Sequence, residues 1–175
     1  MLDQNYVGGN TADNDIQSSG RNGTILNGLS GDDILRGSRG DDILTGGSGN
    51  DQLWGGDGAD QFRFFGNNIG GASDLDKIYD LDFSEGDTLV FGNYANLNFT
   101  DGSGINAFNG GADAQISTWA GLAKAVSESG GAISVSEKGN TNVLILTINN
   151  GHDQIQSIHI TGGWDAYAAA ASTPA

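Results

Sequence analysis

An aspartate recurs at every ninth position between residues 31 and 62, in the stretch GDDILRGSRGDDILTGGSGNDQLWGGDGADQF. A leucine or phenylalanine follows two residues after each aspartate, so it keeps the same period. A carboxylate and an apolar side chain that hold a fixed phase over several repeats are typical of a solenoid, in which each repeat contacts only its neighbours. The aspartates are Asp33, Asp42, Asp51 and Asp60, and the apolar residues are Leu26, Leu35, Leu44, Leu53 and Phe62.

The repeat unit reads glycine-glycine-x-glycine-x-aspartate followed by x-apolar-x, as in GGSGNDQLW and GGDGADQFR. Three residues around the apolar position suffice for a short strand with that side chain inward. The glycine-rich part is expected to turn the chain, because glycine accepts a positive φ. Two units then form one coil, and residues eighteen apart stack at roughly 4.8 Å. A shorter unit, GRNGTIL, precedes these repeats with Thr24 in place of the aspartate, as expected of a degenerate terminal repeat.

This stacking places Asp33 beside Asp51 and Asp42 beside Asp60. Two carboxylates at that distance repel each other by on the order of a few kcal/mol. No basic residue recurs with the same period, and Arg36 and Arg39 flank a single repeat. A hard divalent cation with an all-oxygen shell fits the site, and calcium is the natural candidate.

Three other interpretations of the repeats were weighed. An EF-hand is excluded, because its loop needs a glutamate at the twelfth position and two flanking helices. A metal-free solenoid with solvated acidic turns and a low-complexity linker both stay open as alternatives.

Composition supports a cation as the partner. The 175 residues include 22 acidic and 7 basic side chains, a formal charge of −15. This excess argues against nucleic acid or an anionic membrane surface as a partner. Cysteine is absent, so no disulfide or thiolate zinc site is expected. The first residues, MLDQNYVGGNTADND, have neither a basic start nor an apolar core, so no cleavable signal peptide is predicted, and no run is long enough for a membrane span.

The stretch from Gly28 to Phe62 resembles the nonapeptide repeats of the repeats-in-toxin (RTX) family, also called hemolysin-type calcium-binding repeats. The resemblance implies a parallel β-roll in which each loop binds calcium through the carbonyls of its first four residues and the aspartate at its sixth. Leu29 and Ser38 replace the second glycine of their units, which implies backbone strain there. The implied carbonyl donors are Gly28, Leu29, Ser30 and Gly31; Gly37, Ser38, Arg39 and Gly40; Gly46, Gly47, Ser48 and Gly49; and Gly55, Gly56, Asp57 and Gly58.

The segment DKIYDLDFSEGDTLVF, residues 76–91, resembles the strand and turn that close the β-roll in secreted RTX proteins, including the C-terminal domains of serralysin-type proteases. The resemblance implies that an aspartate here completes the last calcium site, with Asp76 as the first choice and Asp74 as the second. An ordinary hairpin with solvated acidic residues stays open as the alternative.

The rest of the chain predicts a conventional cap for the roll. Residues 116–129 predict an amphipathic helix with Ser117 or Thr118 as N-cap. The segments AISVS, NVLILTI and QIQSIHI predict three strands, with the second one central. The expected architecture is mostly β: an N-terminal lead-in or cap over 1–19, an RTX β-roll over 20–75, and a C-terminal capping and secretion-signal region over 76–175.

The predicted function is a non-catalytic calcium-binding module that folds on calcium after type I secretion. At least two ions are expected, and three or four with sites at the ends. The resemblance implies the type I secretion machinery as a partner during export and an extracellular or cell-surface location. No catalytic motif is visible, His152 and His159 are expected at the surface or in a turn, and a catalytic domain, if any, is expected upstream in a longer parent. The alternative is a carbohydrate-binding module of a secreted polysaccharide-modifying enzyme that uses Trp54, although packing of Trp54 against the capping region is the expected arrangement.

Overall fold

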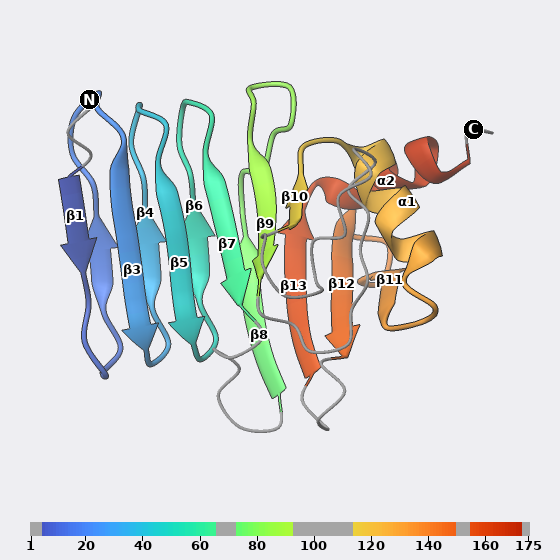
Figure 1. Cartoon of the computed structure of the whole chain (residues 1–175), viewed down its shortest axis with the longest axis horizontal. Helices are drawn as coiled ribbons and strands as arrows, with labels where there is room; N and C mark the ends of the chain where they lie inside the picture. Colours follow the sequence, from blue (N-terminus) through green and yellow to red (C-terminus); the bar gives the residue numbers. More distant parts are fainter. Residues whose placement is uncertain (1–4, 66–72, 93–113, 150–154, 173–175) are drawn as a thin grey trace.

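The computed structural model describes residues 5–65, 73–92, 114–149 and 155–172. Within these residues two β-sheets face each other along the length of the molecule, and two helices lie at the C-terminal end (Figure 1). The first sheet has the order β1 (Asn5–Gly8), β3 (Thr24–Ser30), β5 (Ile43–Ser48), β7 (Gln61–Phe65), β9 (Thr88–Gly92) and β10 (Ala114–Ile116). The second has the order β11 (Ile133–Glu137), β12 (Val143–Asn149), β13 (Ile155–Thr161), β8 (Ser73–Ile78), β6 (Gln52–Trp54), β4 (Ile34–Arg36) and β2 (Asp15–Gln17).

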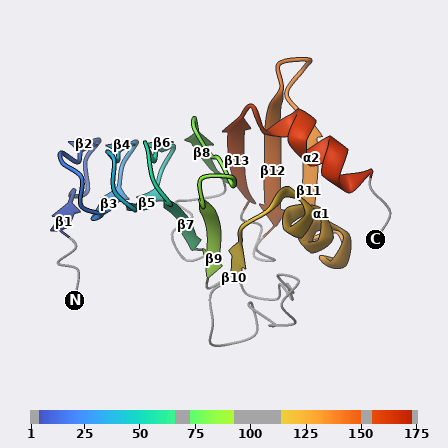
Figure 2. The same cartoon turned by 90° about the horizontal axis from the view of Figure 1, so that it is seen from above.

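The repeats form the coils of a parallel β-roll, as predicted. Successive strands alternate between the two sheets, which is visible when the molecule is viewed from above (Figure 2). The register of the parallel pairs confirms that two repeats make one coil, because Leu26 pairs with Leu44 and Leu35 pairs with Leu53. The apolar residue of every repeat lies between the sheets, and each of these five side chains is 0% exposed: Leu26, Leu35, Leu44, Leu53 and Phe62.

The roll begins earlier than the boundary at residue 20 that the sequence suggested. In the described part of the lead-in, β1 pairs in parallel with β3, with Tyr6 opposite Ile25. On the other sheet β2 pairs in parallel with β4, and Ile16 lies opposite Leu35 with 7% of its surface exposed. Residues 5–17 therefore add one more coil to the roll.

The segment that follows the repeats closes the last coil. β8 belongs to one sheet and β9 to the other. The alternative of an ordinary hairpin in residues 76–91 is therefore wrong, because a hairpin would pair these two strands with each other. Phe83, in the turn between them, packs against the core and makes an edge contact with Trp119, with 4.9 Å between the ring centroids.

The C-terminal half continues both sheets rather than forming a separate layer. β10 pairs antiparallel with β9, β13 pairs in parallel with β8, and β12 lies between β13 and β11 in antiparallel pairing. The three predicted strands and the central position of the second are confirmed. The strands bury a denser apolar core than the coils, with Leu144, Leu146, Ile148, Ile158 and Ile160 all at most 1% exposed.

The two helices complete this core. α1 (Trp119–Glu128) begins after Thr118, whose side chain accepts a hydrogen bond from the Gly121 N–H over 2.9 Å, so the predicted N-cap is confirmed. α2 (Gly163–Ala171) places Tyr167 in the core and Trp164 against it. With ten and nine residues, neither of these described helices is long enough to cross a membrane.

Candidate metal centre

The glycine-rich loops lie in two rows, one along each edge of the roll. The first row contains the loops of residues 28–33 and 46–51, and it continues to Asp74 and Asp76. The second row contains the loops of residues 37–42 and 55–60, and it continues to Asp80 and Asp87. Loops that lie one coil apart in sequence are therefore direct neighbours in space, as the sequence predicted.

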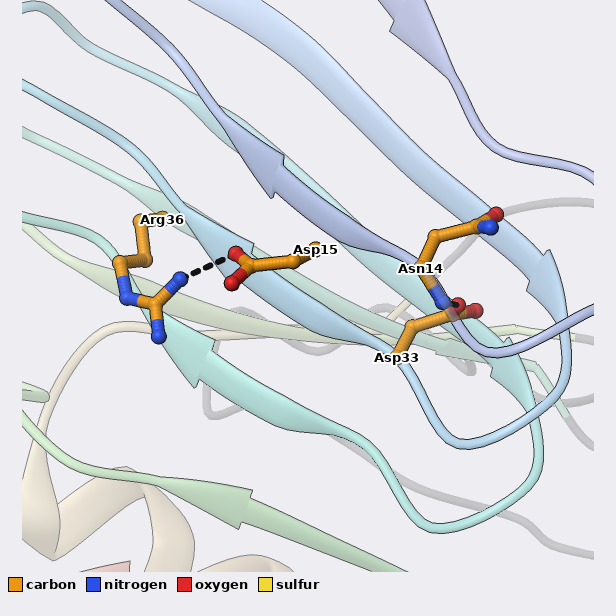
Figure 3. A network of polar contacts seen from close by, with 4 residues as sticks. All are labelled: Asn14, Asp15, Asp33 and Arg36. Atoms are coloured by element: carbon orange, nitrogen blue, oxygen red, sulfur yellow. Dashed lines mark hydrogen bonds and ion pairs between the residues drawn. The ribbon is translucent and has the colours of Figure 1, made fainter.

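In the first row, each aspartate carboxylate accepts a hydrogen bond from the backbone one coil closer to the N-terminus. Asp33 Oδ1 accepts from the Asn14 N–H over 2.7 Å (Figure 3). Asp51 Oδ1 accepts from the Asp33 N–H over 2.8 Å, and Asp76 Oδ1 accepts from the Asp51 N–H over 3.0 Å. Asp76 thus continues the first row, and Asp74 lies beside it, accepting from the Gly49 N–H over 3.1 Å.

The second row repeats the same ladder. Asp42 Oδ1 accepts from the Thr24 N–H over 2.6 Å, and Asp60 Oδ1 accepts from the Asp42 N–H over 2.7 Å. Asp87 Oδ1 then accepts from the Asp60 N–H over 2.9 Å. Asp87 was not among the predicted site residues, nor was Asn14 at the start of the first row.

The second oxygen of the central aspartates has no such donor. Asp33, Asp51 and Asp60 are 1%, 1% and 0% exposed. Among the described residues, no hydrogen-bond donor reaches the Oδ2 atom of any of the three. A buried acceptor without a partner costs about 1–3 kcal/mol, and more when it is charged. The alternative of solvated acidic turns is therefore wrong, and these carboxylates need a proton or a cation.

The same burial changes their acid–base behaviour. The pKa of Asp51 is raised to about 7, with burial as the largest cause. The nearby carboxylates of Asp33 and Asp74 also raise this pKa, whereas the hydrogen bond from the Asp33 N–H lowers it. Burial likewise raises the pKa of Asp60 to about 7, with Asp87 and Asp42 as the nearest like charges. The pKa of Asp76 is raised by burial first and by Asp74 and Asp51 second. Without a counter-ion, these sites favour the protonated carboxyl group.

The loop backbone is shaped around these carboxylates. A Cβ atom on Gly46 would lie 2.1 Å from Asp51 Oδ2, and one on Gly55 would lie 2.2 Å from Asp60 Oδ2. The first glycine of each repeat is therefore required by the close approach of its own aspartate. The donor chemistry, carboxylate oxygens together with backbone carbonyls, is the kind that calcium prefers.

The second position of the repeat is strained in one of the two predicted loops. Leu29 has a φ of 81°, in the same region as Gly47 at 116° and Gly56 at 99°, so the strain predicted for Leu29 is confirmed. Ser38 is not among the described residues with positive φ. Its N–H instead donates to Asp42 Oδ2 over 2.7 Å. The loop of residues 37–42 therefore differs from the other three.

Two of the predicted carbonyl donors accept a backbone hydrogen bond from the loop stacked on their own. Ser48 O accepts from the Gly31 N–H and Ser38 O accepts from the Asp57 N–H, each over 2.9 Å. Within the described ranges, no three His, Cys, Asp or Glu side chains converge in the manner of a metal site built from side chains alone. An ion between these loops would take much of its shell from the backbone.

Trp54 lies on the outer face of the second sheet and packs within the protein. Its ring stacks on Tyr79, with 4.1 Å between centroids and 1° between planes. On the neighbouring strand β4, the Arg36 guanidinium lies 5.1 Å from the Trp54 ring centroid and pairs with Asp15 (Figure 3). Because the strand order is β8-β6-β4, these two neighbours flank Trp54 on opposite sides. Stacking of a sugar on either ring face would require displacement of a neighbour.

The one described histidine lies on a strand, not exposed at the surface or in a turn as expected. His159 lies half-buried on β13, and burial first and the charges of Lys138 and Lys77 second lower its pKa. His152 lies outside the described residues.

Comparison with known proteins supports the calcium-loop interpretation. A family model described as the RTX calcium-binding nonapeptide repeat matches residues 27–62 with four copies. No curated protein matches the chain in sequence. Among solved structures, the chain is similar to the AlgE6R3 subunit of the Azotobacter vinelandii mannuronan C5-epimerase, with a TM-score of 0.53 and 22% identity over 100% of this chain and 89% of that chain. At this identity the likeness concerns the fold. Residues 27–62 thus match the RTX calcium-binding nonapeptide repeat, and they form part of a parallel β-roll.

Proposed function

We propose that this chain is a non-catalytic calcium-responsive module whose glycine-rich coils fold when calcium binds between their loops. The observation that carries the proposal is the set of three buried carboxylate oxygens without a donor, on Asp33, Asp51 and Asp60. In the folded roll each is held in place by a hydrogen bond to its other oxygen, so the folded loop fixes the orientation of the carboxylate.

The chain's own residues define where calcium would be held. Asp33 with Asp51 would serve the first row, and Asp42 with Asp60 the second, with Asp76 or Asp74 at the end of the first row. The carbonyls of each loop's first four residues would complete the oxygen shell, as in the predicted ligand set. Bound calcium supplies positive charge that neutralises the stacked carboxylates. At least two ions are proposed, with three or four if the end positions also bind.

Because calcium would bind only the folded coils, folding would depend on the calcium concentration of the compartment. A ligand that binds the folded state alone stabilises it by about 4 kcal/mol at a thousandfold excess over its Kd. In a compartment with little calcium, the repelling carboxylates would keep the coils extended. We propose that the module is exported by a type I secretion system and folds outside the cell, in the extracellular medium or at the cell surface. The formal charge of −15 supports this proposal, because such a chain resists collapse until cations bind.

We also propose that the C-terminal region resembles the C-terminal domains of serralysins and that it carries the secretion signal. Both points stay predictions. Any catalytic activity is proposed to reside in another part of a longer parent protein.

Polysaccharide binding is the second candidate. A fold shared with a subunit of a mannuronan C5-epimerase is compatible with it, and Trp54 is an outward aromatic residue of the coils. The packing of Tyr79 and Arg36 on either side of Trp54 argues against its ring faces as a sugar platform. Retardation in an alginate gel that depends on Trp54, tested with Trp54→Ala, would support this candidate.

A calcium titration followed by circular dichroism tests the main proposal. We expect the metal-stripped chain to lack much of its β-signal and to gain it cooperatively as calcium is added. Magnesium at the same concentration serves as the control, since it demands a tighter octahedral shell than these loops offer. A chain that is fully folded in chelator, with the same unfolding midpoint after calcium is added, would contradict the proposal.

A further inference from the structure

The second loop row has an unusual end nearest the N-terminus, where residues 18–24 lie against the loop of residues 37–42. Thr24 takes the place that an aspartate holds in the next coils, and its N–H donates to Asp42 over 2.6 Å. We call the contact between residues 18–24 and 37–42 the basal junction. Its chemistry differs from that of the calcium loops in three respects.

First, hydroxyl groups fill the basal junction. Ser18 Oγ lies 2.8 Å from Thr24 Oγ1 and 3.3 Å from Ser38 Oγ. Ser18 and Thr24 are only 5% and 3% exposed. Three hydroxyls can donate to and accept from one another, so this buried polar group is satisfied without an ion.

Second, each oxygen of the carboxylate at the basal junction accepts a hydrogen bond from a backbone amide. Asp42 Oδ1 accepts from Thr24 and Asp42 Oδ2 accepts from the Ser38 N–H over 2.7 Å. This differs from Asp33, Asp51 and Asp60, whose Oδ2 atoms have no donor among the described residues. Two backbone amides stabilise a carboxylate in its charged form. The difference follows from Ser38, which does not adopt the positive φ of the other second positions and so turns its N–H toward Asp42.

Third, two arginines and one aspartate lie at the surface of the basal junction. Ser18 and Ser38 line an open pocket of about 530 Å³ together with Arg21, Arg39 and Asp57. Arg39 lies 3.8 Å from the exposed carboxylate of Asp57, while Arg21 makes no ion pair with another described residue. These are two of the seven basic residues of the chain. Guanidinium groups at this position repel an approaching divalent cation.

We infer that the basal junction is a metal-free fastening, in which hydroxyl and amide hydrogen bonds replace the calcium ion of a regular loop pair. Calcium-dependent stacking of the second row then begins one coil later, between residues 37–42 and 55–60. The inference rests on the proposed calcium function of the other loops. It assigns Ser18, Thr24 and Ser38 a structural role that the repeat pattern does not show, because none of them is an aspartate, although Thr24 stands where the unit has one.

Two measurements on the whole chain test this inference. A crystal grown in calcium, measured for anomalous scattering, should show ions between loops 28–33 and 46–51 and none at the basal junction. Native mass spectrometry should give Ser18→Ala the same number of calcium ions as the wild type, with a lower urea midpoint at saturating calcium. The matched variant Asp51→Asn should lose at least one ion.

The outcomes separate this inference from the function on which it rests. An anomalous peak between residues 18–24 and 37–42, or loss of an ion in Ser18→Ala, would overturn the inference and leave the calcium function intact. A wild-type chain that binds no calcium would overturn both. If Ser18→Ala fails to fold, the anomalous map of the wild-type crystal alone decides the question.

Discussion

The repeat coils and the C-terminal half extend the same two sheets but are held together by different interactions. In the coils, the three-residue strand β4 buries a single apolar side chain, Leu35, and the adjoining loops bury the carboxylates of Asp33 and Asp42. In the C-terminal half, the seven-residue strand β12 buries three apolar side chains and packs near two helices. The comparison shows that a continuous sheet can change its source of stability along its length.

The difference has a simple energetic origin. Ordering a residue costs roughly 1–2 kcal/mol of backbone entropy, and glycine loses the most. Burying one leucine per nine residues returns about 1.5–3 kcal/mol, which falls well short of that cost. We therefore expect the coils to depend on an additional ligand, whereas the C-terminal strands and helices bury enough apolar surface to resemble an ordinary domain core.

Calcium removal should produce the largest effect, and an unequal one. In chelator, we expect amides of residues 24–62 to lose most of their protection from hydrogen exchange, because the stacked carboxylates repel once the cation is gone. Amides of β12 and of α1 should keep more of theirs, since their core contains no carboxylate. Hydrogen exchange with mass spectrometry, on the same chain with and without calcium, measures both regions at once.

The control is re-addition of calcium, which should restore protection in the coils. Uniform loss of protection across both regions would mean that the two halves fold as one cooperative unit. The distinction between their sources of stability would then have no thermodynamic consequence.

A pair of substitutions should separate the two regions next. Leu146→Ala removes a side chain that is 1% exposed, and it should cost about 2–5 kcal/mol. We expect that loss in calcium and in chelator alike, wherever β12 is folded. Asp51→Asn keeps an acceptor for the Asp33 N–H but removes a buried charge. It should destabilise the coils in calcium and stabilise them in chelator at pH 8.

Urea unfolding of both variants, in calcium and in chelator, measures whether the stability change of Asp51→Asn reverses its sign. Lower stability of Asp51→Asn in chelator would show that its carboxylate is not a source of repulsion. Leu44→Ala, a core variant within the coils, is the matched control that removes apolar volume without removing charge.

The repeat register, the inward leucines, the central strand and the Thr118 cap all followed from local patterns in the sequence. Each depends on a fixed spacing that the chain preserves, such as the eighteen-residue offset from Leu26 to Leu44. The choice of Asp76 for the last calcium site came from a family resemblance. Asp76 accepts a hydrogen bond from the Asp51 N–H, and its role as a calcium ligand stays a prediction.

The coil of residues 5–17 and the role of Asp87 did not follow, because the spacing changes there. Ile16 pairs with Leu35, an offset of nineteen residues, so the nine-residue phase is lost before the first clear repeat. Asp87 bonds to Asp60 across 27 residues. A loop of different length leaves the hydrogen-bond ladder intact but removes the period from the sequence. Asn14 was also missed, because it stands where the repeat has an aspartate, and the aspartate is the residue by which the repeat is recognised in the sequence.

pH should shift the stability of the coils in a direction that depends on calcium. In metal-stripped protein, Asp51 and Asp60 have folded-state pKa values of about 7, above the ordinary value of 3.8. The folded state then binds more protons than the unfolded chain between these values, so its stability falls as pH rises from about 4 to about 7. We expect a higher thermal midpoint at pH 5 than at pH 8 without metal.

Saturating calcium should abolish or reverse this trend, because an ion replaces the protons. Calorimetry of calcium binding at pH 6 in two buffers of different ionisation enthalpy should therefore detect proton release. The C-terminal half has few buried acids, and a variant such as Leu146→Ala should retain the same pH trend as the wild type. A metal-stripped chain that becomes more stable from pH 5 to pH 8 would contradict the proposed state of these carboxylates.

The smallest expected effect concerns the second position of the repeat. Leu29 is the one described residue with positive φ that is neither glycine nor asparagine, and its side chain is 44% exposed. A left-handed conformation costs such a residue roughly 1–2 kcal/mol. Replacing it with glycine removes that cost but adds an entropic cost of folding of about 0.5–1 kcal/mol, because glycine loses more conformational freedom. Leu29→Gly should therefore raise the free energy of unfolding by up to about 1 kcal/mol in saturating calcium. Ser38→Gly is the matched control, because Ser38 has no left-handed strain to relieve, and it should lower stability by a similar amount. Equal gains in both variants, measured by urea unfolding, would mean that the two loops share one backbone conformation when calcium is bound.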